Sequence, residues 1–367
     1  MPTPQPATLI IQTAFIGDVI LMTALLEHLA RHEPGAPVDV LVRRGNEGLL
    51  AGHPHVRRVL VWDKQHRKYA ALWQLLRQVR ATGYGRVVTL QRFASTGLLV
   101  AFSGAPVRMG FTQNPFSRFF THRVPHVIGD GTHEVERNLR LLNEELRTEG
   151  RRQPMKNEEL GIPDTSSSLI PHSSSSAAST PRLYPSAADE ATAAALAAGP
   201  YVCLAPTSVW FTKQYPEAKW LELLAALPPN YAVYLLGGPP DVAACERLAA
   251  ASGRANVTSL AGKIGLLASA ALMRGARMNY VNDSAPMHLC SAVGAPVTAV
   301  FCSTVPAFGF GPLSPVSFVV ETPEPLACRP CGLHGYGACP QGHFRCAYGI
   351  EVAQLLATLP VDVARTL

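Results

Sequence analysis

The sequence predicts an α/β protein with two parallel-sheet domains, and three observations support this. The chain has 367 residues, more than a single hydrophobic core usually accommodates. Short apolar runs alternate with segments whose apolar residues recur at helical spacing. A Ser-rich stretch at residues 164–181 divides this alternation into two series. Alternating strands and helices form parallel sheets covered by helices.

The first series, residues 1–163, precedes the Ser-rich linker or loop. Its apolar runs predict strands at 8–12, 38–44, 56–63 and 85–91, and helices at 19–32, 69–80 and 133–146.

The second series spans residues 182–349, and a terminal helix is expected at 350–367. Within the series, strands are expected at 201–206, 231–238, 256–262, 278–283 and 296–301, and helices at 216–227, 240–252, 265–275 and 285–294.

The net charge of +6 is unevenly distributed along the chain. Residues 1–160 contain 21 Lys and Arg against 14 Asp and Glu, a net charge of +7, whereas residues 161–367 contain 11 against 12. Such a field attracts anionic partners such as nucleic acid, phosphorylated glycan or acidic lipid. A solvated surface explains it equally well. Nucleic acid is disfavoured because the sequence shows no known binding motif and no basic stripe interleaved with aromatic residues.

The apolar runs also indicate where the protein acts. Each is interrupted by charge, Pro or Gly well before the ~20 residues that a membrane-spanning helix needs. The first run follows no basic residue and ends in Gly17-Asp18, which suits a buried strand better than a secretion signal. A cytosolic protein is therefore expected.

Several common site motifs are missing from the sequence. It has no GxxxxGK[ST] loop and no GxGxxG after a strand, which disfavours an ATPase or a dinucleotide oxidoreductase. It also lacks HExxH, GxSxG and an Asp-x-Asp pair for metal-held diphosphate. The chemistry is therefore sought in the loops that follow strands, because ligands of parallel sheets bind at the carboxyl ends of strands.

Two such loops could bind phosphate. Asp283 and Ser284 precede a helix that begins near Ala285, and a helix N-terminus binds anions through its free N–H groups and its dipole. Helix capping by either side chain is the simpler alternative. Thr207, Ser208 and Lys213 lie in another loop, where two hydroxyls and an ammonium could hold phosphate oxygens. A lone surface lysine is the competing interpretation.

Two aspartates follow other strands. Asp241 comes after a glycine pair that begins with Gly237. The glycines would let a ligand approach the backbone, and the carboxylate could accept ribose hydroxyls. Asp18 follows the first strand, where it could act as a general base on an acceptor hydroxyl. For both residues, a helix cap is the alternative.

Taken in order, these loops resemble glycosyltransferase family 9, the ADP-heptose:lipopolysaccharide heptosyltransferases. The matching segments are FIGDVILMTALL, PTSVWFTKQYP, LLGGPPD, SLAGK and VNDSAPMHLCSAVGAPVTAVF. The second heptosyltransferase type is the nearer likeness. The resemblance implies a GT-B fold, in which two Rossmann-like domains with parallel sheets face each other across a cleft.

The resemblance also implies an activity and its site. Heptose would move from ADP-heptose to the inner core of lipid A-linked oligosaccharide, with inversion and without a required metal, at the inner face of the cytoplasmic membrane. Asp18 matches the proposed catalytic base. The donor-binding residues would be Thr207, Ser208, Lys213, Gly237, Asp241, Asp283, Ser284, Met287 and His288. The alternatives are transfer from another nucleotide sugar and a catalytically silent module that binds anionic glycans.

Four cysteines cluster near the end of the chain, at Cys328, Cys331, Cys339 and Cys346. Their spacing begins with CxxC and suits a structural zinc. Reduced thiols that pack a small loop and a disulfide or redox pair are the other interpretations.

Overall fold

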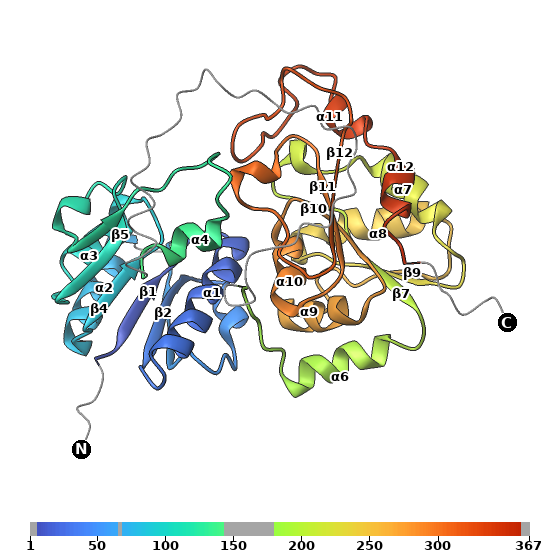
Figure 1. Ribbon diagram of the computed structural model, residues 1–367. Helices are drawn as coiled ribbons and strands as arrows, with labels where there is room; N and C mark the ends of the chain where they lie inside the picture. Colours follow the sequence, from blue (N-terminus) through green and yellow to red (C-terminus); the bar gives the residue numbers. More distant parts are fainter. Residues whose placement is uncertain (1–5, 65–67, 143–179, 361–367) are drawn as a thin grey trace. The chain divides into compact units, whose positions relative to one another are not determined.

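The computed structural model describes residues 6–64, 68–142 and 180–360 and divides the chain into two compact units (Figure 1). In the described part of the chain, residues 180–184 belong to the first unit and residues 185–360 form the second. The expected boundary at 163 and residues 164–179 of the Ser-rich segment lie outside the described residues.

Unit 1 contains a six-stranded parallel sheet with the order β3-β2-β1-β4-β5-β6. Because parallel crossovers are right-handed, α1 covers one face of the sheet, and α2 and α3 cover the other. The elements are β1 (Thr8–Ile11), α1 (Ile16–His32), β2 (Val38–Arg43), β3 (Arg58–Trp62), α2 (Lys68–Thr82), β4 (Arg86–Thr89), α3 (Ala94–Ala101), β5 (Val107–Phe111), β6 (His122–Val124) and α4 (Glu134–Leu139).

Helix α1 is buried along most of its length, which explains its nearly continuous apolar sequence. It packs against α4 on one side. The segment before unit 2 binds it as well: the Arg182 amide donates to Thr23 Oγ1 at 2.9 Å, and the Tyr184 hydroxyl donates to Glu27 at 2.8 Å. These contacts cover polar positions of α1 that would otherwise face solvent.

Unit 2 contains a second six-stranded parallel sheet, with the order β12-β11-β10-β7-β8-β9. Its elements are α6 (Ala187–Leu196), β7 (Tyr201–Ala205), α7 (Glu217–Ala226), β8 (Ala232–Leu235), α8 (Val242–Ala251), β9 (Val257–Ser259), α9 (Leu266–Gly275), β10 (Asn279–Asn282), α10 (Ala285–Val293), β11 (Val297–Phe301), β12 (Ser317–Glu321), α11 (Arg345–Tyr348) and α12 (Val352–Leu356).

Both sheets therefore have the same doubly wound topology. When each unit is counted from its own first strand, the order is 3-2-1-4-5-6 in both. In such sheets the crevice that binds ligands opens where the strand order reverses. That point lies between β1 and β4 in unit 1 and between β7 and β10 in unit 2. The predicted α/β class with two parallel sheets is confirmed.

The structure corrects two predicted helices. The terminal helix expected at 350–367 is only α12 within the described residues, and it packs on α7 as part of unit 2. Pro360 follows it, and proline cannot continue a helix. The helix expected at 133–146 is described as α4, and residues from 143 lie outside the described part. No described helix is long and apolar enough to cross a membrane.

Candidate functional site

Lys213 and Asp283 meet at the switch point of unit 2. Lys213 ends a 3₁₀ turn (Phe211–Lys213) after β7, and Asp283 follows β10 directly. Lys213 Nζ lies 2.7 Å from Asp283 Oδ2, and the Thr304 hydroxyl donates to the same oxygen at 2.5 Å. Both side chains of the ion pair are largely buried. The structure thus brings together two of the residues expected to bind the donor and adds Thr304.

The N-terminus of α10 is not capped by the side chains expected as the simpler alternative. The Asp283 carboxylate binds Lys213, and Ser284, at the N-cap position, makes no side-chain capping bond. Ser284 Oγ instead lies 3.4 Å from the Asn282 carbonyl. The first N–H groups of a helix have no partner within the helix. In α10, however, Pro286 has no N–H, and the Met287 amide donates to the Ser284 carbonyl at 3.1 Å. The Ala285 N–H and the positive end of the helix dipole can therefore attract an anion beside Lys213.

The loop containing Thr207 and Ser208 is held through its backbone. The Asn282 amide lies 3.3 Å from the Thr207 carbonyl, and the Gln214 amide donates to the Ser208 carbonyl at 2.6 Å. Asn282 also accepts from the Tyr215 amide at 2.9 Å. These bonds use carbonyls and leave both hydroxyls on the partly exposed surface of the loop, where a ligand can reach them.

The Cys-rich segment packs against this same loop. The Tyr336 amide donates to Thr212 Oγ1 at 2.7 Å, and the Thr212 amide donates to the Tyr336 carbonyl at 3.1 Å. Gly335 has a φ of +77°, and a Cβ there would lie 2.8 Å from Thr212 Oγ1. Only glycine permits this approach without strain. The segment therefore fixes the residue next to Lys213.

The cysteines themselves are free thiols. Cys328 Sγ lies 3.8 Å from His343 Nε2, and Cys331 Sγ lies 3.2 Å from the Cys328 carbonyl. Among the described residues, no three His, Cys, Asp or Glu side chains are arranged so that they could hold a metal ion. The zinc, reduced-thiol and disulfide interpretations of this segment all stay predictions.

The glycine pair after β8 forms the backbone contacts of Asp241. The Gly238 amide donates to Asp241 Oδ2 at 2.8 Å, which is the capping bond considered as the alternative role. A Cβ at Gly237 would lie 2.6 Å from the Asp241 Cβ, so the glycine is needed for this approach. A ribose contact at Asp241 would use the remaining carboxylate lone pairs.

Met287 and His288 are buried side chains of α10, and their assignment to the donor site stays a prediction. Met287 is 0% exposed and His288 is 6% exposed, both on α10. Both side chains anchor α10 in the core of unit 2, which fixes the position of its N-terminus.

Asp18 occupies the first turn of α1 at the switch point of unit 1. Its Oδ2 accepts from the Phe15 amide at 3.1 Å, so it caps the helix, as the alternative role required. Burial, and then the negative charge of Glu134, raise the pKa of Asp18 from 3.8 to about 6. A carboxylate with a raised pKa is a better proton acceptor near neutral pH. Capping and proton transfer are thus compatible at this residue.

Glu134 is buried on α4, which packs against α1. Burial raises the pKa of Glu134, but hydrogen bonding to His126 at 3.0 Å and the charge of Arg137 at 2.8 Å outweigh it and lower the net pKa. Glu134 is therefore ionised at neutral pH and acts on Asp18 as a fixed negative charge. The sequence alone indicates no role for this residue.

The same edge of unit 1 carries two further polar contacts. The Thr13 hydroxyl donates to Gln91 Oε1 at 2.7 Å and links the ends of β1 and β4 across the switch point. Lys64 Nζ donates to the Thr13 carbonyl at 2.9 Å. These residues follow strands, so the rule that located Asp18 could also have found them.

Solved structures share this fold. The chain superposes on ADP-heptose lipopolysaccharide heptosyltransferase II from Escherichia coli with a TM-score of 0.74 and 21% identity, over 96% of this chain and 97% of that one. It superposes on the E. coli heptosyltransferase WaaC, solved with ADP, with a TM-score of 0.64 and 23% identity, over 85% and 92% of the two chains. This architecture is the GT-B fold.

The family follows from the sequence match. Residues 72–331 match the model of glycosyltransferase family 9 (heptosyltransferase), and the chain belongs to this family. A curated relative, lipopolysaccharide heptosyltransferase 3 of E. coli, is 28% identical over 306 residues, covering 79% of this chain and 82% of the relative. The match to the family confirms the predicted membership. The relatives represent different heptosyltransferase types, so the likeness to the second type stays a prediction.

Proposed function

We propose that the protein transfers heptose from ADP-heptose to the core oligosaccharide of lipopolysaccharide. The observation that carries this proposal is the group at the switch point of unit 2, where Lys213 and Asp283 adjoin the N-terminus of α10. Membership of family 9 and the names of the relatives, which are lipopolysaccharide heptosyltransferases, indicate the sugar and the acceptor.

Unit 2 binds the donor in this proposal. Lys213 and the N-terminus of α10 supply positive charge to the diphosphate, and Thr207 and Ser208 supply hydroxyl donors. Charge that develops on the leaving ADP is stabilised best by donors that are already in place. Because this group neutralises the leaving ADP, the mechanism assigns no step to a metal ion.

Unit 1 supplies the base. Asp18 removes the proton from the attacking acceptor hydroxyl as that oxygen bonds to the anomeric carbon, and ADP departs from the opposite face with inversion. Glu134 supports the step by raising the pKa of Asp18. The basic sequence of the first half, with a net charge of +7 over residues 1–160, suits a phosphorylated acceptor whose lipid end lies in the cytoplasmic face of a membrane.

Calorimetric titration of the full chain with ADP, GDP and UDP, with and without Mg²⁺, tests the donor. Selective binding of ADP without metal is expected. A transfer assay with ADP-heptose and lipid-linked core, with the product anomer assigned by NMR, tests the reaction and its inversion. Selective binding of GDP or UDP would contradict the heptose assignment, and a product with retained configuration would contradict the role of Asp18.

A further inference from the structure

Helix α2 of unit 1 carries an exposed row of two aromatic residues and two arginines. Tyr69, Trp73, Arg77 and Arg80 lie within roughly 80° of one another around the helix axis at 100° per residue, and we name them the α2 stripe. Tyr69 is 75% exposed and Trp73 is 62% exposed. The adjacent face of the helix carries the buried residues Leu72, Leu75, Leu76 and Val79. The core of unit 1 is therefore formed without the four side chains of the α2 stripe.

The charge around the stripe has one sign. Between Asp63 and Asp130 the chain has no acidic residue and ten Lys or Arg. This interval contains all of α2 and α3, the layer on one face of the sheet. A basic stripe with interleaved aromatic residues is not expected from the sequence, and α2 corrects that expectation.

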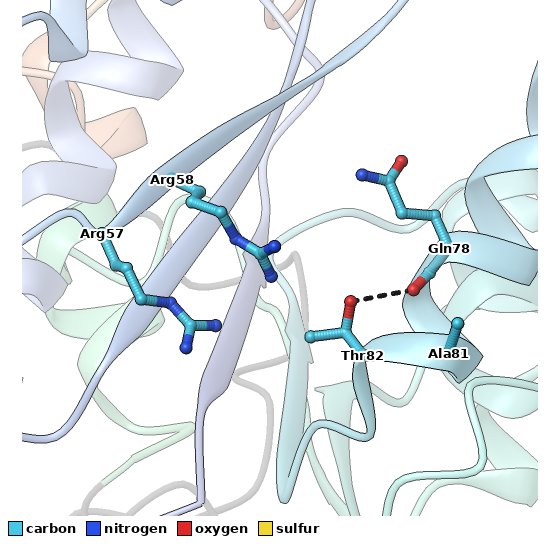
Figure 2. A pocket seen from close by; sticks show the side chains of 5 residues that line it. All are labelled: Arg57, Arg58, Gln78, Ala81 and Thr82. Atoms are coloured by element: carbon cyan, nitrogen blue, oxygen red, sulfur yellow. Dashed lines mark hydrogen bonds between the residues drawn. The ribbon is translucent and has the colours of Figure 1, made fainter.

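Two features extend this surface beyond the stripe. Phe102 and Phe119 are exposed near the end of α3, and the Arg118 guanidinium lies 4.7 Å from the Phe119 ring centre. The final turns of α2 border a hollow of about 510 Å³, and Figure 2 shows Arg57 and Arg58 opposite Gln78, Ala81 and Thr82.

Arg57 and Arg58 make the surface of the hollow cationic. Each binds Asp39, at 2.8 Å for Arg57 and 2.7 Å for Arg58. Burial raises the pKa of Asp39, but hydrogen bonds from the two arginines and Tyr84 outweigh it and lower the pKa to about 2. Two cations share one anion, and both arginine side chains are more than 40% exposed. The hollow therefore has a net positive charge.

From these observations we infer that the α2 stripe docks unit 1 onto an anionic phospholipid surface. Trp and Tyr prefer the boundary between headgroups and acyl chains, because their rings are apolar with one polar end. Arginines beside them attract acidic headgroups at about 1 kcal/mol each, a fivefold change in affinity. A helix with this outer face lies flat in the interface. The inference rests on the proposed function, because docking would bring the protein to the surface where a lipid-linked acceptor lies.

Co-sedimentation of the full chain with vesicles tests this inference. Vesicles of phosphatidylcholine mixed with phosphatidylglycerol should bind the protein, and vesicles of phosphatidylcholine alone should bind it weakly. Arg77→Gln with Arg80→Gln should weaken binding by about 25-fold at low salt, because each arginine contributes about fivefold. Arg31→Gln with Arg247→Gln removes the same charge from exposed sites outside α2 and α3, and should change binding only slightly.

Trp73 provides a direct optical readout. Its emission should shift to shorter wavelength when mixed vesicles are added, because the indole leaves water. The shift should disappear in Trp73→Phe and remain in Trp210→Phe, which alters an exposed tryptophan of unit 2.

Three results would overturn the inference: equal binding to both vesicle types, unchanged binding of the double arginine variant, or tighter binding of single-stranded RNA than of mixed vesicles through the same arginines. ADP titration of each variant confirms that unit 2 is intact. If wild type fails to bind ADP but binds mixed vesicles, the proposed donor fails while the docking surface stands.

Discussion

Lys213 Nζ lies 2.7 Å from Asp283 Oδ2, so two residues that the sequence assigns to the donor site bind each other. Thr304 donates to the same carboxylate oxygen. The ion pair holds the Lys213 ammonium beside the N-terminus of α10. It does not occupy all three N–H donors of that ammonium. A diphosphate can therefore bind to an ammonium that is already positioned.

Replacing Lys213 with alanine should weaken ADP binding about 10-fold to 150-fold, the loss of a charge-assisted hydrogen bond of about 1.5–3 kcal/mol. Lys219→Ala is a matched control, because its side chain is 15% exposed compared with 16% for Lys213, and it also forms ion pairs in unit 2. Calorimetry measures both variants. Equal affinities would remove Lys213 from the donor site.

The same ion pair predicts a coupling in stability. Lys213→Ala leaves the largely buried Asp283 carboxylate without its cation, which should lower the free energy of unfolding by several kcal/mol. Adding Asp283→Asn removes the unpaired charge and should restore part of the loss. Urea denaturation of the two single variants and the double variant measures the coupling. Additive losses would show that the pair does not act as a unit.

The sequence predicts site residues from the positions at which strands end. Lys213, Asp283 and Asp18 were found because each follows a strand of a parallel sheet, and the strand pattern was strong enough to read. Met287 and His288 were taken from the same motif, but the motif does not show which positions of α10 face the core. Glu134 was missed because its effect on Asp18 arises from the packing of α4 on α1, a contact between segments more than a hundred residues apart in sequence.

The pKa of Asp18 predicts the acid limb of the pH profile of kcat/KM. A base with a pKa of about 6 loses its proton-accepting form below that pH, so kcat/KM should fall about tenfold per pH unit below about pH 6. Steady-state rates between pH 4.5 and 8 measure this limb. An unperturbed aspartate would give a flat profile over most of this range.

Glu134 should set the position of that limb. Glu134→Gln removes a negative charge that raises the pKa of Asp18, so the acid limb should move to lower pH. Glu136→Gln, two residues further along α4 and only partly buried, is the control for a change of net charge. A limb that stays in place in Glu134→Gln would exclude this electrostatic contribution.

Asp18 should also reduce stability at neutral pH. Its folded pKa of about 6 exceeds the reference value of 3.8, so the stability associated with the protonated group is present below pH 3.8 and is lost as pH rises through 6. Asp18→Asn keeps a side-chain oxygen for the Phe15 amide. This variant should be more stable than wild type at pH 8, by about 1–3 kcal/mol, and no more stable at pH 3.5. Denaturation at the two pH values measures the difference.

The transfer rate of Asp18→Asn tests the central claim most directly. With ADP-heptose and a lipid-linked core acceptor at pH 8, this variant should bind ADP with wild-type affinity and transfer heptose roughly 10²–10⁴ times more slowly, because a general base has been removed. Transfer at the wild-type rate by Asp18→Asn would contradict the account, since the acceptor proton would then leave by a route that does not use this carboxylate.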